Sequence, residues 1–208
     1  VDRDGLVDPQ VRLPEGVGIV SVMQVNNEIG TVQPIADLYA RAQAEGALFV
    51  CDAVQAAGKM PIAEADMIAV SAHKFHGPKG IGGLWVRAGA QPAPLLHGGG
   101  QEQGIRSGTL APALCVGLGE AARLAAERRE ADSVHVEKLF EIALSTFGQG
   151  WNINGSATSR YHGNLNLSRE GLDAARLISD MRNIAFSLGS ACASGSGWRR
   201  LWCTGRRC

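Results

Sequence analysis

A lysine beside a histidine lies in the segment Ser71–Gly80, which reads SAHKFHGPKG. The apolar run before it, Ala65–Val70, is typical of a buried strand, so Lys74 is predicted to lie just past a strand end. A lysine held at the edge of a sheet can lose part of its hydration, and desolvation lowers the pKa of an amine. An amine of lowered pKa can form a Schiff base with a carbonyl group. The alternative is a solvated lysine in front of a turn.

Polar side chains also follow two other apolar runs, Gly18–Val25 and Ala47–Cys51, which are predicted to be strands. A helix is expected between them, beginning at Pro34 and ending near Gly46. This order predicts a mostly parallel α/β sheet, in which ligands gather beyond the carboxyl ends of the strands. The alternative is that polar residues flank strands simply because loops are wet. Six side chains are expected at that edge: Asn27, Asp52, Gln55, Ser71, His73 and Lys74.

The rest of the chain is predicted to be less regular. A fourth strand is expected over Gly82–Val86, and a long irregular loop over residues 92–110. Two helices are expected over residues 113–130 and 134–147, with a domain boundary at the charged stretch Glu127–Asp132. Three short elements are expected beyond them: a strand over residues 164–167, a helix around residues 172–178 and a strand over residues 184–187.

An accessible cysteine is predicted near the end of the chain, where residues 189–196 read GSACASGS. Cys192 lies there among small residues, unlike the buried surroundings that free cysteines usually have. With Lys74 and Asp52, it gives a Schiff-base candidate, a carboxylate at a strand end and a thiol. A lysine imine with an aspartate partner is how proteins hold pyridoxal phosphate. The odd number and irregular spacing of the five cysteines favour reduced thiols in a cytosolic protein.

The composition is that of an ordinary globular protein, with 45% apolar and 19% charged residues among 208. The formal net charge of zero argues against nucleic-acid or membrane binding as the main activity. No signal peptide or apolar run of membrane length is present in the sequence. A metal site is not expected, because no cysteine or carboxylate joins His73, His76 and His97 at ligand spacing.

Five segments resemble, in the same order, the motifs of the cysteine desulfurases, which are fold-type I, class V aminotransferase-like enzymes. The resemblance implies an α/β transferase that uses pyridoxal phosphate and serves iron–sulfur cluster assembly. Residues 1–130 would be the second half of the large cofactor-binding domain, and residues 131–208 part of a smaller α+β domain with the cysteine loop. The segments lie between Gly18 and Ser196 and read VNNEIGTVQPI, DAVQAAGKMPI, SAHKFHGPKGIGGLWV, HGGGQEQGIRSGT and GSACASGS.

The resemblance also implies roles for single residues. Lys74 would carry the cofactor and move the substrate Cα proton, with His73 beside it in the catalytic group. Cys192 would take the sulfur of L-cysteine as a persulfide and release L-alanine, which requires a thiolate on a loop that can move. The cofactor would be held by Asp52 at the pyridine nitrogen, Gln55 at the ring hydroxyl, Asn27 (the second of the Asn26–Asn27 pair) near the ring hydroxyl and the substrate carboxylate, Ser71 and His73 at the phosphate, and Thr109 at the phosphate of the partner subunit.

The implied partners are L-cysteine, a second copy of the chain in a homodimer, and an iron–sulfur scaffold or other sulfur-acceptor protein in the cytoplasm. The family's large domain is expected to begin before Val1. The end of the chain, GWRRLWCTGRRC, departs from the family's pattern, and a frameshift is one hypothesis for it. The alternatives are another class V enzyme, such as a transaminase or selenocysteine lyase, and an inactive truncated chain that serves as an interaction module. Cys192 favours the desulfurase, because a transaminase needs no such thiol.

Overall fold

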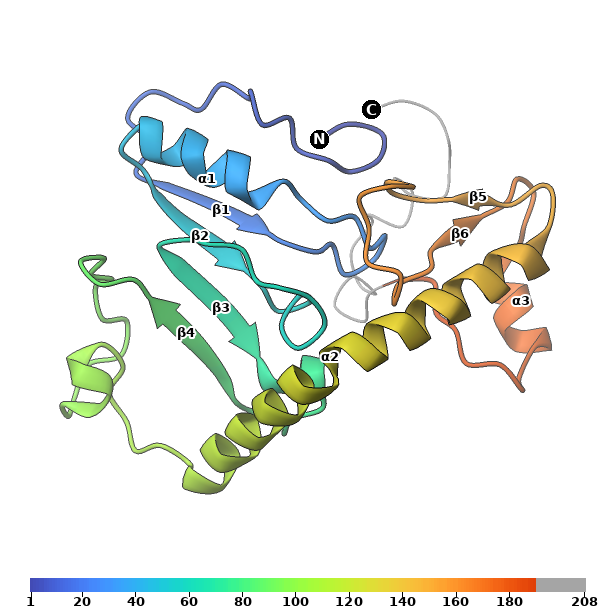
Figure 1. Ribbon diagram of the computed structural model, residues 1–208. Helices are drawn as coiled ribbons and strands as arrows, with labels where there is room; N and C mark the ends of the chain where they lie inside the picture. Colours follow the sequence, from blue (N-terminus) through green and yellow to red (C-terminus); the bar gives the residue numbers. More distant parts are fainter. Residues whose placement is uncertain (190–208) are drawn as a thin grey trace.

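A four-stranded sheet lies at the centre of the computed structural model, which describes residues 1–189 (Figure 1). The first three strands are parallel, and the fourth is antiparallel to the third. This arrangement confirms the predicted mostly parallel α/β sheet, and each strand lies within two residues of its predicted range. The strands lie in the order β1 (Ile19–Met23), β2 (Leu48–Asp52), β3 (Met67–Ser71) and β4 (Gly82–Val86).

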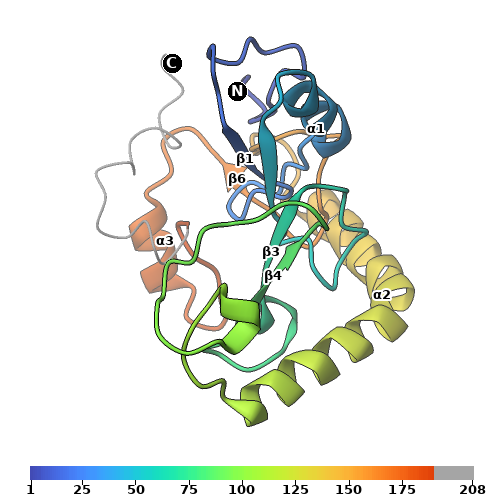
Figure 2. The same ribbon diagram turned by 90° about the vertical axis from the view of Figure 1, so that its left-hand side faces the viewer.

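Helix α1 (Ile35–Ala44) connects β1 to β2 and packs over these two strands (Figures 1 and 2). Its apolar residues recur at helical spacing and are buried in one cluster with Phe49 of β2. The helix ends just before Gly46, whose φ of +71° is a conformation that glycine adopts without strain. The predicted helix and its buried face are confirmed; the buried residues are Ile35, Leu38 and Ala42.

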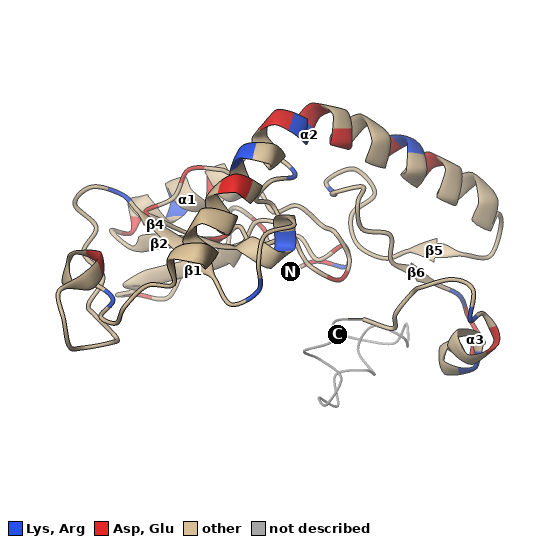
Figure 3. Cartoon of the chain, turned by 90° about the horizontal axis from the view of Figure 1, so that it is seen from below, with Lys and Arg blue, Asp and Glu red and all other residues tan. Residues whose placement is uncertain are grey.

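Helix α2 (Pro112–Phe147) is one continuous helix of 36 residues, so the prediction of two helices over residues 113–130 and 134–147 is wrong. The charged stretch Glu127–Asp132 does not interrupt it, because this stretch contains neither proline nor glycine and its side chains are exposed. Figure 3 shows charged residues of both signs along the helix. Among residues 1–189, no helix combines the length and the apolar character that crossing a membrane requires. Ion pairs at helical spacing join Arg123 to Glu120 and to Glu127.

Residues 148–189, here called the C-terminal lobe, lie at the far end of α2 (Figure 1). The strand predicted over residues 184–187 is wrong, since these residues have no strand partner in the part of the chain that is described and their side chains are exposed. No break in α2 marks the boundary at residue 130, and the division into two domains stays a prediction. The elements of the lobe are β5 (Asn152–Ile153), the antiparallel β6 (Leu167–Ser168) and α3 (Ala174–Asp180).

Small residues of α2 let the segment around Lys74 approach the helix closely. Lys74 lies on the short 3-10 helix η1 (Ala72–Phe75), which follows β3 directly. A Cβ added to Gly117 would come within 2.9 Å of the Pro78 ring, so only glycine fits between the two segments. The small residues on this side of α2 therefore determine how closely the segments that contain Gly58, Gly77 and Pro78 pack against the helix. These small residues are Gly117, Ala121 and Ala125.

Replacing Gly58 with alanine is expected to lower the free energy of unfolding by about 3 kcal/mol. Gly58 has a φ of +76°, and an added Cβ would lie 2.7 Å from Cβ of Phe75 and 3.0 Å from Cβ of Ala125. The left-handed conformation contributes about 1 kcal/mol of this cost and the overpacking the rest. Gly46→Ala is the matched control, because Gly46 has a φ of +71° but open space around it. Urea denaturation measures both variants, and equal losses would contradict the packing argument.

A buried carboxylate ties the amino-terminal ends of β2, β3 and the segment after β4 together. Asp66 is 0% exposed and accepts hydrogen bonds from the Phe49 N–H at 2.8 Å and from Nε of Arg87 at 2.7 Å. Burial disfavours the ionised carboxylate, yet these hydrogen bonds hold the pKa of Asp66 below its ordinary value. The side chains of Tyr39 and Gln43 also donate to it.

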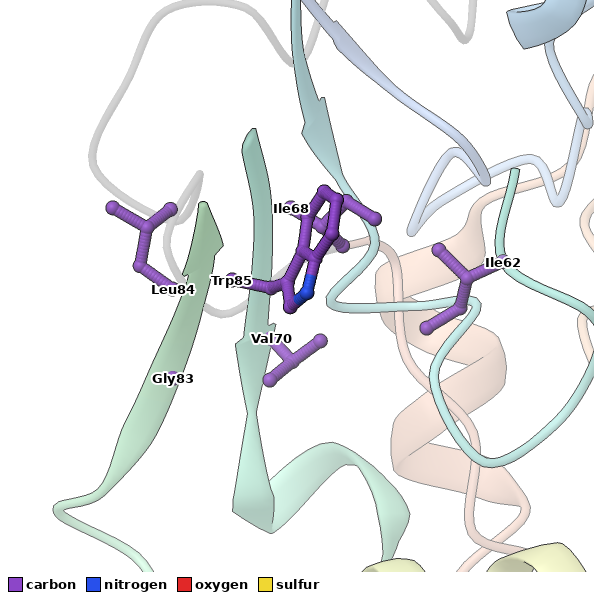
Figure 4. A pocket seen from close by; sticks show the side chains of 6 residues that line it. All are labelled: Ile62, Ile68, Val70, Gly83, Leu84 and Trp85. Atoms are coloured by element: carbon purple, nitrogen blue, oxygen red, sulfur yellow. The ribbon is translucent and has the colours of Figure 1, made fainter. Parts of the chain in front are cut away.

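An apolar hollow lies on β3 and β4 (Figure 4). Leu84 and Trp85 are about half exposed there, at 50% and 54%. The hollow contains no ionisable side chain, so it is not a place for acid–base or nucleophilic chemistry. Its lining consists of Ile62, Ile68, Val70, Gly83, Leu84 and Trp85.

Candidate active site

The predicted site residues lie along the carboxyl edge of the parallel strands. Asp52 is the last residue of β2 and is in register with both neighbouring strands. Ser71 is the last residue of β3, and η1 then carries His73 and Lys74. Because parallel strands end at the same edge, these four residues lie at one end of the sheet, where ligands of open α/β sheets bind.

Ser71 and His73 form a hydrogen-bonded pair, with 2.9 Å between the serine Oγ and the histidine Nδ1. Ser71 is partly buried and His73 is exposed, so both side chains reach the surface. A hydroxyl and an imidazole can each donate a hydrogen bond to a phosphate oxygen. The pair therefore suits the predicted phosphate-holding role.

The desolvated lysine of this edge is Lys59. Its Nζ donates to Oε1 of Gln55 at 3.1 Å and lies 5.7 Å from the centre of the Tyr161 ring. Burial, together with the charge of Lys74 nearby, lowers the pKa of Lys59. The partial desolvation that the sequence predicts for Lys74 is therefore found at its neighbour, while Lys74 itself is exposed. The four-residue spacing of Gln55 and Lys59 is the sequence signal that would have indicated this pair.

Two of the predicted cofactor contacts are held in one orientation by local hydrogen bonds. Oδ1 of Asp52 accepts the Val54 N–H at 2.9 Å, which fixes the carboxylate at the end of β2. Oε1 of Gln55 faces an ammonium group that can only donate, so the amide nitrogen of Gln55 is the group left to contact a ligand. The site thus offers a fixed carboxylate and a fixed amide donor.

Asn27 lies in the turn that follows β1 and its side chain is exposed. Its neighbour Asn26 has a structural task, because its Oδ1 accepts the N–H groups of Glu28 at 2.9 Å and Ile29 at 3.0 Å. Such a bond pattern stabilises turns. The choice of Asn27 as the second, ligand-facing member of the pair is consistent with this division of tasks.

The other two predicted residues are Thr109 and Cys192. Thr109 lies in the exposed segment between the short 3-10 helix η2 (Gln101–Gly104) and α2. Cys192 and the GWRRLWCTGRRC end lie outside the described residues. Cys51 is fully buried, and burial raises the pKa of its thiol to about 11, so this cysteine is protonated and unreactive. Cys115 on α2 is half-buried.

The donor set at the strand ends fits pyridoxal phosphate. The cofactor needs a primary amine for covalent attachment, a carboxylate for its ring nitrogen and donors for its hydroxyl and phosphate oxygens. Lys74 supplies the amine and Asp52 the carboxylate, while the amide of Gln55 and the Ser71–His73 pair supply the donors. We therefore find no chemical conflict between the residues present and this cofactor.

Comparison with known proteins identifies the family. Residues 1–201 match the aminotransferase class-V family. The mitochondrial cysteine desulfurase of Eremothecium gossypii is 46% identical over 208 residues, which cover 94% of this chain and 42% of that protein. The cysteine desulfurase IscS of Rickettsia akari is 45% identical over 187 residues, covering 86% of this chain and 46% of that protein. The chain spans about half the length of the curated relatives it matches.

Solved structures give the same result. A NifS-like protein superposes with a TM-score of 0.82 at 35% identity, covering 88% of this chain and 53% of that one. The NifS-like protein of Rickettsia africae superposes with a TM-score of 0.80 at 28% identity, covering 91% and 57%. The predicted fold, part of a fold-type I α/β transferase, is confirmed, and so is the resemblance to cysteine desulfurases. The chain belongs to the aminotransferase class-V family.

Proposed function

We propose that this protein is a cysteine desulfurase that uses pyridoxal phosphate to convert L-cysteine to L-alanine and passes the sulfur to an acceptor protein. The observation that carries the proposal is the grouping of Asp52, Gln55, Ser71, His73 and Lys74 at one edge of the sheet. The similarity to proteins named cysteine desulfurase supports it over 86–94% of the chain.

The cofactor supplies an electron sink that stabilises negative charge on the substrate carbon skeleton when it is bound. Asp52 would hold the ring nitrogen in its charged form, and Gln55 would orient the ring through its hydroxyl. Ser71 and His73 would hold the phosphate. Lys74 would be the attachment point for the cofactor and the base that moves the proton at the substrate Cα. Asn27 binds the substrate carboxylate.

Cys192 is the sulfur acceptor in this proposal. Its thiolate attacks the substrate sulfur, so that an S–S bond forms while the C–S bond of L-cysteine breaks. The electron pair of the broken bond stays on the substrate carbon, which takes up a proton and leaves as the methyl group of L-alanine. The thiol becomes a persulfide, and the sulfur then passes to an iron–sulfur scaffold or other acceptor. Thr109 would contact the cofactor phosphate of the other subunit in the proposed homodimer, and the proposed location is the cytoplasm.

Two measurements on the purified chain test the function. Addition of pyridoxal phosphate is expected to give the visible absorbance band of lysine-bound cofactor, and addition of L-cysteine to release alanine and, with a reductant, sulfide. Cys192→Ala is expected to abolish sulfide release but retain the band. Cys115→Ala, in a half-buried cysteine outside the site, is the control. Sulfide release that survives in Cys192→Ala would contradict the proposed role, and release of keto acid in place of alanine would favour a transaminase.

A further inference from the structure

The turn that carries Asn27 is held from outside by one distant segment. Every main-chain carbonyl from Asn26 to Gln33 accepts a hydrogen bond. Four consecutive carbonyls, those of residues 27–30, accept hydrogen bonds from groups of residues 160–166 in the C-terminal lobe. We call these donors the turn clamp: Nδ2 of Asn164 to Asn27 at 3.1 Å, Nδ2 of Asn166 to Glu28 at 3.0 Å, Nη2 of Arg160 to Ile29 at 3.1 Å, and the Tyr161 N–H to Gly30 at 2.8 Å.

Arg160 shows that this arrangement is specific. Its side chain is only 7% exposed, and its guanidinium donates to main-chain carbonyls, including those of Ile29 and Ser156. A buried charge is costly unless its donors are satisfied; here Nη1 and Nη2 both donate hydrogen bonds, whereas Nε has no partner among the described residues. The ring of Phe140 lies 5.2 Å from the guanidinium carbon and adds a cation–π contact. Because Ile29 and Gly30 are buried, their carbonyls need protein donors, and the C-terminal lobe supplies them through Arg160 and the Tyr161 N–H.

The Asn166 amide is held on both sides. Its Nδ2 donates to the Glu28 carbonyl, and its Oδ1 accepts from Nδ2 of Asn154 at 2.7 Å. Within the turn, Oδ1 of Asn26 accepts the N–H groups of Glu28 and Ile29, and the Asn26 carbonyl accepts the Gly30 N–H. The main chain on both sides of Asn27 is therefore held by hydrogen bonds.

The same turn borders the segment that leads to the cysteine. A Cβ added to Gly189 would lie 3.9 Å from Oε2 of Glu28. Gly189 precedes Cys192 by three residues. The turn is thus placed between the carboxyl end of β1, the C-terminal lobe and the start of the sulfur-accepting segment.

We propose that Arg160, Asn164 and Asn166 are positioning residues for the desulfurase reaction, which fix the turn so that Asn27 is held ready for the carboxylate of L-cysteine. This inference rests on the proposed function. The clamp residues act through the turn and do not contact the substrate. A small displacement of a positioned group reduces substrate binding strongly, since binding depends on geometry at the scale of an ångström.

Asn166→Asp is the sharpest test. The variant keeps the shape of the side chain and its acceptor for Asn154, but it loses the donor to the Glu28 carbonyl. Asn164→Ala is the second variant. It removes the donor to the Asn27 carbonyl, and because Asn27 is exposed, water can replace that hydrogen bond and the variant should still fold. Asn152→Asp is the matched control, an exposed asparagine in the same lobe that gains the same charge.

The full chain loaded with pyridoxal phosphate is assayed for sulfide release over a range of L-cysteine concentrations. Both variants are expected to raise the KM for L-cysteine about tenfold with a smaller change in kcat, which a loss of folded enzyme would not produce. In the protein without cofactor, amide hydrogen exchange over residues 27–31 is expected to accelerate in both variants and to stay unchanged in Asn152→Asp.

Unchanged KM in both variants, in a chain whose wild type releases sulfide, would overturn the inference and leave the proposed function standing. A fall in kcat alone that parallels the loss of folded protein would also overturn it, because that result marks a purely structural role. A wild-type chain that releases no sulfide would overturn the proposed function, while accelerated exchange in the variants would still support the clamp on the turn.

Discussion

Replacing Lys74 with alanine is expected to abolish the visible band of lysine-bound pyridoxal phosphate and to lower sulfide release from L-cysteine by about 10³-fold or more. The variant removes both the attachment point and the base at the substrate Cα. Lys74 lies on η1, directly after β3, with its amine exposed at the carboxyl edge of the sheet. An absorbance spectrum after cofactor addition, followed by a sulfide assay, measures the two losses.

Lys59 makes this experiment discriminating. It is the lysine whose pKa is lowered by burial, and its Nζ lies against Gln55 at the same edge. If desolvation alone chose the attachment point, the band would survive in Lys74→Ala and disappear in Lys59→Met. We expect the reverse, with the band retained in Lys59→Met. Lys79→Ala, in an exposed lysine of the same segment, is the control and is expected to behave like the wild type.

The second large effect is expected at Asp66, where alanine should lower the free energy of unfolding by about 3 kcal/mol. The substitution leaves the Phe49 N–H, a buried donor, without its acceptor and takes the ion pair from Arg87. Tm is expected to fall by about 10 °C. Glu64→Ala is the matched control, since Glu64 is an exposed carboxylate two residues away, and its effect should be within about 0.5 kcal/mol. A loss of similar size in both variants would contradict the structural role of Asp66.

The pH dependence of the free energy of unfolding is also expected to report on the role of Asp66. The pKa of Asp66 is lower in the folded protein than in the unfolded chain, where the pKa of an aspartate is about 3.9. Its contribution to stability is therefore complete above that pH and is lost as the pH falls through the lower folded-state value. Urea denaturation of the wild type between about pH 5 and pH 2.5 should show this loss, and Asp66→Asn should lack that part of the curve.

The sheet and its reactive edge could be predicted from the sequence because their signals are local. Each strand is a short apolar run bounded by turn formers, and Asp52 and Ser71 are the last residues of their strands. Once the strands are parallel, the edge at which their side chains meet follows from geometry. The charged stretch Glu127–Asp132 is predicted as a solvated helix face and as a domain boundary; the helix is continuous there, because a solvated charged face does not require a break.

The features that the sequence could not supply depend on distant contacts. The Nζ of Lys59 lies against the ring of Tyr161, which comes from the C-terminal lobe. The hydrogen bond between Asn164 and Asn27 spans 137 residues, and no periodicity or local motif announces such a pairing. Glycine spacing likewise does not reveal that Gly117 faces Pro78 across two elements. The residues of the candidate site could therefore be predicted from the sequence, but the distant contacts that hold them in place could not.

The C-terminal lobe is braced at two points. With a rise of about 1.5 Å per residue, helix α2 is roughly 54 Å long. If α2 alone connected the lobe to the sheet, a bend of about 10° at the middle of the helix would move its C-terminal end by about 5 Å. The turn clamp adds a second support close to the carboxyl end of β1. A rotation of the lobe relative to the sheet therefore requires that α2 bends and that the hydrogen bonds of the turn clamp break at the same time, so residues 148–189 are held at a fixed distance from the sheet.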